Sequence, residues 1–140
     1  MEDISFQEAA QALAAKDPRY PVEAYHLLRE GLDFTVKALR KEGEGPRHVS
    51  GKELLDGLRD YVLNEFGPLS LTVLNAWGIR RTADFGELVF NLVEAGKLSR
   101  TEQDSRADFA DGYDFHEAFA KPFEVTAPVK RVPARRRSRR

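Results

Sequence analysis

Seven of the last eleven residues of this 140-residue chain are lysine or arginine, and this basic tail is its strongest chemical feature. The cations are Lys130, Arg131, Arg135, Arg136, Arg137, Arg139 and Arg140. Such a run releases counterions from a nucleic acid and binds it with an affinity that depends on salt rather than on base sequence. Guanidinium groups also suit bidentate contacts with phosphate. The tail therefore predicts contact with RNA or DNA. The alternatives are a solubilising terminus and contact with an acidic protein surface, including the chain's own.

A weaker candidate ligand or interaction site lies between residues 80 and 117, where cations and acids are interspersed. Its candidate residues are Arg80, Arg81, Asp104, Arg106, Asp108 and His116. The arginine pair suits a phosphate contact, although cations after a helix also stabilise the negative end of its dipole. The acids between residues 104 and 117 are dense enough for a hard cation. Their spacing is not that of a calcium loop, so no metal site is predicted.

Nucleophilic chemistry has little support in the sequence. No serine or acid stands near His26, His48 or His116 in a recognisable catalytic arrangement, and the chain has no cysteine. The lack of cysteine excludes a disulfide scaffold, thiolate metal sites and a cysteine nucleophile. A triad assembled from distant residues leaves no such local signature. No catalytic residue and no cofactor are predicted, and the protein is more consistent with a non-enzyme.

The net charge of −1 hides a partition along the chain. Residues 1–127 contain 15 Lys/Arg and 23 Asp/Glu, a net charge of −8, whereas residues 128–140 carry +7. The first part repels phosphate at long range and the second attracts it. The N-terminus is acidic where a secretory signal is basic, and no segment approaches the roughly 18 apolar residues of a membrane span. We expect a cytoplasmic protein with one acidic domain over residues 1–127 and a disordered tail over 128–140.

Helices must position the residues of the acidic part. Apolar residues at helical spacing predict helices over residues 4–15 and 21–41. Ser50 and Glu53 have the spacing of a capping box, which predicts the start of a third helix. Gly67 and the proline after it end that helix.

Two more helices are predicted after this Gly-Pro turn. A short fourth helix begins at Pro68 and is closed by Gly78, which supplies a left-handed residue. A fifth helix is capped by Thr82 or Asp84 and ends at Gly96. The sequence therefore predicts a mainly α protein of about five helices.

This order of helices resembles that of a winged helix. Residues 51–96 would form its three-helix core and residues 97–115 a small β-hairpin and wing, giving a winged-helix-like arrangement over residues 51–115. A plain helical bundle with an irregular C-terminal arm is the alternative. The segment in the place of the recognition helix, residues 82–95, contains three acids and no Lys or Arg. A helix that enters the major groove offers donors to phosphates and base edges, so a winged-helix shape would not by itself imply DNA binding here.

Several strings occur in order: residues 48–61 and 82–93, the triplets Phe66-Gly67-Pro68 and Trp77-Gly78-Ile79, and residues 104–109. On these strings the chain resembles an uncharacterised bacterial family restricted to the Verrucomicrobia and Planctomycetes group. The resemblance covers roughly residues 5–123 and leaves out the tail. It implies a bacterial cytoplasm, which makes a nuclear-import role for the tail improbable, and it carries over no catalytic residue.

These observations favour a non-enzymatic interaction or regulatory module. Its acidic domain would bind a protein partner, and its tail would contact RNA or DNA. The first alternative is an enzyme or small-ligand-binding domain that uses the region of residues 80–117. The second is a structural subunit of a complex. No membrane partner is predicted, and self-association is left open.

Overall fold

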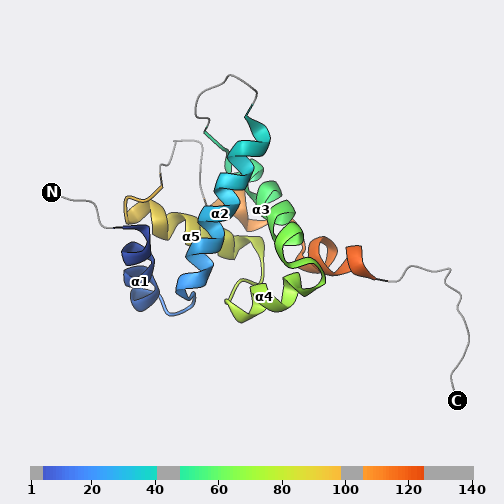
Figure 1. Cartoon of the computed structure of the whole chain (residues 1–140), viewed down its shortest axis with the longest axis horizontal. Coiled ribbons are helices and arrows are strands. Elements are labelled where there is room, and N and C mark those ends of the chain that lie inside the picture. The colour runs from blue at the N-terminus through green and yellow to red at the C-terminus, as the bar shows by residue number, and fades with distance from the viewer. Residues whose placement is uncertain (1–4, 41–47, 99–105, 125–140) are drawn as a thin grey trace, which may run out of the picture.

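Residues 5–40, 48–98 and 106–124 are described by the computed structural model, and these residues contain six α-helices and no β-strand (Figure 1). The helices are α1 (Phe6–Lys16), α2 (Val22–Leu39), α3 (Gly51–Phe66), α4 (Ser70–Ala76), α5 (Thr82–Glu94) and α6 (Ala107–Ala110). Three short helical turns complete the described chain: η1 (Gly67–Leu69), η2 (His116–Ala120) and η3 (Lys121–Phe123). The prediction of a mainly α protein is confirmed. The tail, residues 128–140, and Asp104 lie outside the described residues.

Local chemistry sets the ends of α3, as predicted. The Glu53 N–H donates to the Ser50 hydroxyl at 3.1 Å, and the Ser50 N–H donates to the Glu53 carboxylate at the same distance. Both halves of the predicted capping box are therefore formed. The helix ends at Gly67, whose φ of +50° lies in the left-handed region that favours glycine.

The centre of the fold is the contact between α2 and α3, which lie side by side in Figure 1. Two glycines allow this close approach. A Cβ at Gly57 of α3 would collide with the Thr35 side chain of α2, and one at Gly31 would collide with Leu58. The Thr35 hydroxyl is buried and donates to the Gly31 carbonyl at 2.7 Å, within its own helix. α2 and α3 therefore contact each other partly through small residues, and their interface is not made of apolar side chains alone.

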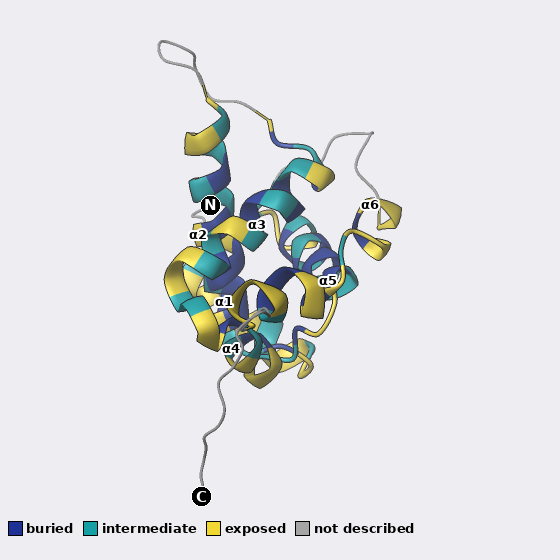
Figure 2. Cartoon of the chain, turned by 90° about the vertical axis from the view of Figure 1, so that its right-hand side faces the viewer, coloured by how far each residue is buried: buried dark blue, intermediate teal, exposed yellow. Residues whose placement is uncertain are grey.

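α5 packs into this core instead of standing on the surface. Its buried apolar residues are Phe85, Leu88, Phe90 and Leu92. α5 contacts both α2 and α6, and α1 packs against α2. Figure 2 shows buried residues along the inner faces of these helices and exposed residues on the outer turns. None of the described helices is long and apolar enough to cross a membrane.

The β-hairpin expected over residues 97–115 is not present in the described part of that range. Its second half, residues 106–115, forms α6 and a turn, and residues 99–105 lie outside the described residues. The physical reason is the burial of Phe109, which is 2% exposed and packs against Gly86 and Gly51. A single helical turn points this ring inward between α3 and α5. The prediction of a strand here is therefore wrong for residues 106–115, and the winged-helix-like arrangement loses its wing there.

Candidate functional site

Arg80 and Arg81 lie exposed just before α5, and their main chain has a structural role. Both N–H groups donate to the Asp84 carboxylate, at 2.8 and 3.2 Å. The same carboxylate accepts a 2.6 Å hydrogen bond from the Tyr20 hydroxyl. Asp84 therefore stabilises the start of α5 from its third position, and the N-cap is Arg81 rather than the predicted Thr82 or Asp84. Burial and Asp84 together hold the pKa of Tyr20 above its ordinary value.

Arg106 has a different role from Arg80 and Arg81, because its side chain contacts Glu87. Its Nε donates to Glu87 at 3.2 Å, and its guanidinium stands 5.2 Å above the Phe90 ring. The other Glu87 oxygen pairs with Arg19 at 3.3 Å. Arg106 therefore ties α6 to α5 within a chain of alternating charges.

That chain of charges continues from Arg19 to Asp17 in the turn between α1 and α2. Arg19 donates twice to Asp17, at 2.9 and 2.7 Å, and these bonds lower the pKa of that carboxyl to about 2. Asn91 of α5 donates to Asp17 at 3.1 Å and to the Tyr25 hydroxyl at 3.0 Å. We call Asp17, Arg19, Glu87 and Arg106 the charged cluster. Its two cations and two carboxylates pair with one another. The cluster therefore holds the α1–α2 turn, α5 and α6 together, and it offers no unpaired carboxylate that could act as a base.

The other candidates of the 80–117 region lie elsewhere. The side chain of His116 in η2 is 60% exposed, and its Nε2 lies 3.4 Å from Glu124. Asp108 is exposed on α6. Among the described candidates, the structure thus brings only Arg80 and Arg81 together, and it spreads the others over separate contacts. No group of three His, Cys, Asp or Glu side chains in the described residues is placed to hold a metal ion.

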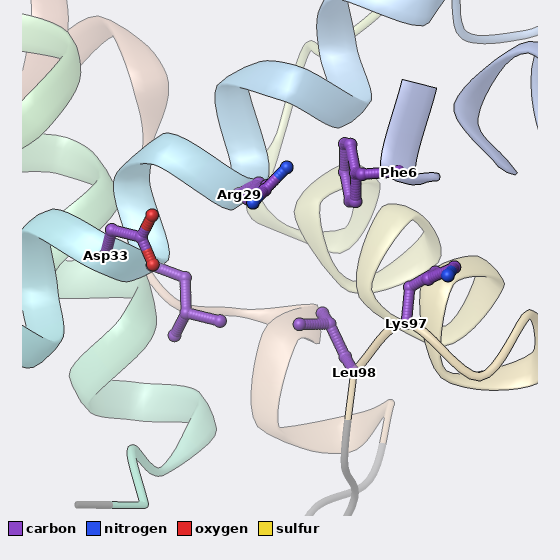
Figure 3. Close-up of a pocket in the computed structure, with 6 residues that line it drawn as sticks. Phe6, Arg29, Asp33, Lys97 and Leu98 are labelled. Carbon is purple, nitrogen blue, oxygen red and sulfur yellow. The ribbon is translucent and has the colours of Figure 1, made fainter. Parts of the chain in front are cut away.

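An open hollow of about 370 Å³ lies where α1, α2 and the end of α5 meet (Figure 3). Its lining residues are Phe6, Arg29, Leu32, Asp33, Lys97 and Leu98. A hollow of this size is at the small end of the range for ligand pockets. The hollow could not be predicted from the sequence, because the three segments that form it are far apart in the chain. The one local signal was the spacing of Arg29 and Asp33, which places both on one side of a helix.

Comparisons with protein-family models, with curated proteins and with solved structures found no match for this chain.

Proposed function

We propose that this protein is a non-enzymatic interaction module of the bacterial cytoplasm, whose acidic helical domain binds a protein partner and whose basic tail contacts RNA or DNA. The observation that carries the proposal is the partition of charge, −8 over residues 1–127 and +7 over residues 128–140. Attraction for phosphate is therefore concentrated in the last thirteen residues of a chain that is otherwise acidic.

The placement of α5 supports the tail, rather than this helix, as the nucleic-acid contact. The apolar side of α5 is in the core, and two of its acids, Asp84 and Glu87, are already engaged with Tyr20 and with Arg19 and Arg106. The charged residues of α5 are all acids, which repel phosphate and offer it no donor, and this counts against the helix as the DNA contact. Arg80 and Arg81 are the cations nearest its start, and both side chains are exposed.

The C-terminal part of the described chain supports an acidic surface for a basic protein partner. Residues 106–124 contain five acids and two cations, and the acids Asp108, Asp111, Asp114, Glu117 and Glu124 are all exposed. Two large apolar side chains are exposed in the described residues, Leu69 at 62% and Phe123 at 44%. Phe123 stands next to the last of these acids, so apolar and charged contacts are available to one partner.

Binding of the full chain to duplex DNA and to single-stranded RNA across a salt series tests the tail. If all seven cations contact phosphates, log K against log [salt] has a slope of up to about −6 for DNA and about −5 for a single strand. A variant with the seven tail cations changed to glutamine should lose most of the affinity and the slope. The matched control is R80Q/R81Q in the folded part, which should keep both.

Two results would overturn the nucleic-acid half of the proposal. One is binding that the glutamine variant retains. The other is no binding by the native chain at low salt. A tail that instead binds the chain's own acidic surface gives the second result, together with salt-dependent changes in the amide spectrum of residues 106–124.

For the protein-partner half, charge reversal at Asp111 and Asp114 should abolish co-purification with a basic partner, and unchanged recovery would refute it.

A further inference from the structure

The hollow between α1, α2 and the end of α5 combines an apolar floor with charges of both signs. Phe6 comes from the start of α1, and Leu98 follows α5. α2 supplies Leu32 together with Arg29 and Asp33. Figure 3 shows Asp33 on one side of the hollow and Arg29 and Lys97 on the others.

The walls of the hollow are held in place by the fold. The ring of Phe6 meets the ring of His26 edge-on, with centroids 5.2 Å apart, and His26 Nε2 lies 2.6 Å from the Gln7 side chain. After α5 the chain reverses at Gly96, whose φ is +77°. The Lys97 N–H donates back to the Leu92 carbonyl at 2.9 Å, the longer bond of a Schellman motif. Contacts within the protein therefore hold the α1 side and the Lys97 side of the hollow in place.

The two charges on α2 do not neutralise each other. Arg29 and Asp33 are four residues apart, a spacing at which such side chains commonly pair. Instead, the Arg29 guanidinium lies 4.8 Å above the Phe6 ring. Within the part of the chain that the structure describes, Asp33 forms no hydrogen bond or ion pair, and Arg29 forms none besides this ring contact. A carboxylate and a guanidinium thus stand about one helical turn apart with hydrogen-bonding capacity left over.

We propose that this hollow binds a free α-amino acid with a branched aliphatic side chain. The ligand's ammonium would pair with Asp33 and its carboxylate with Arg29. Its side chain would rest on the apolar floor. A zwitterion is favoured because it matches both signs of charge in one small ligand, whereas a simple acid or amine would leave one protein charge unmatched. The lining residues of the hollow include none of the tail cations and none of residues 106–124, so the inference stands independently of the proposed function.

The test is a titration of the ¹⁵N-labelled full chain with L-leucine, followed by amide chemical shifts. Two analogues isolate the charges: 4-methylpentanoate lacks the ammonium, and 3-methylbutan-1-amine lacks the carboxylate. Leucine should give saturable shifts in α2 around Arg29 and Asp33 and at Lys97 and Leu98. Each analogue should bind at least about tenfold more weakly, since each loses one charge-assisted contact.

Variants of the two α2 charges should each remove one of these preferences. D33N should weaken leucine by about tenfold and remove its advantage over 4-methylpentanoate. R29Q should remove the advantage over 3-methylbutan-1-amine. The control E23Q removes an exposed acid from α2 away from the hollow and should bind leucine as the native chain does. The proposal fails if leucine causes no saturable shift at these residues. It also fails if both analogues match leucine, or if E23Q weakens binding as much as D33N.

Discussion

Thr82 joins α5 to α6 and to the turn that follows it, and its replacement by valine tests how much these contacts stabilise the packing of α6 against α5. The side chain is 1% exposed. Its hydroxyl donates to the Phe109 carbonyl at 2.6 Å and accepts from the Gly112 N–H at 3.0 Å. Valine keeps the branched shape of threonine at Cβ while removing both bonds.

The expected loss follows from the surroundings of the two partners. The Phe109 carbonyl belongs to a buried residue, and leaving it unpaired costs about 1–3 kcal/mol. Gly112 is exposed, so water can satisfy its N–H, and its loss adds about 1 kcal/mol. T82V should therefore lower the free energy of unfolding by about 2–4 kcal/mol. T82S keeps the hydroxyl and removes one buried methyl, which costs about 1 kcal/mol.

Urea unfolding of the native chain and both variants, followed by far-ultraviolet circular dichroism, measures these differences. The midpoints should fall in the order native, T82S, T82V, with the slope m unchanged. A T82V variant within about 0.5 kcal/mol of the native chain would refute the reasoning, because that is the range of an ordinary surface substitution. So would a serine variant as unstable as the valine variant.

Two further predictions test the helix packing and the charged cluster. G57A should destabilise the fold by about 1–3 kcal/mol, because the new Cβ collides with the Thr35 side chain. In a double-mutant cycle, T35A should relieve part of this cost. Additive losses of stability in the two variants would contradict the contact. The Arg19 guanidinium lowers the pKa of Asp17 from 3.8 to about 2, so the stability that Asp17 contributes is complete above about pH 4 and is lost as the pH falls towards 2. The difference in unfolding free energy between the native chain and D17N should therefore shrink over that interval, and a constant difference would show that the pairing does not act on stability.

Helix boundaries were predictable where a few neighbouring residues decide them. Ser50 and Glu53 cap α3, and left-handed glycines follow α3, α4 and α5 at positions 67, 78 and 96. The start of α5 was predicted less well. The Asp84 carboxylate accepts hydrogen bonds from the N–H groups of Arg80 and Arg81, which precede it, and from the hydroxyl of Tyr20, a residue in a distant turn. The contact with Tyr20 forms only in the folded chain.

The candidate site shows the same division between local and distant contacts. Several cations and acids of residues 80–117 are neighbours in sequence, yet Arg106 pairs with Glu87, 19 residues earlier, and His116 lies near Glu124, outside this region. The hollow draws instead on residues from three separated segments. Proximity in the chain is a poor guide here because helices point neighbouring side chains in different directions.

The sequence by itself determined the mainly helical character, the capping of α3, the glycines that end helices, and the partition of charge between residues 1–127 and 128–140. These depend on local backbone chemistry and on formal charge, which need no partner from elsewhere in the chain. Only the tertiary structure decided that α2 and α3 approach through Gly31 and Gly57, and that Phe109 turns a predicted strand into α6. The tertiary structure also placed Asp33 at a hollow, where it pairs with none of the residues that the structure describes. Each of these results depends on which distant surfaces bury one another, and burial overrides local preference because it contributes more free energy than a single residue's propensity.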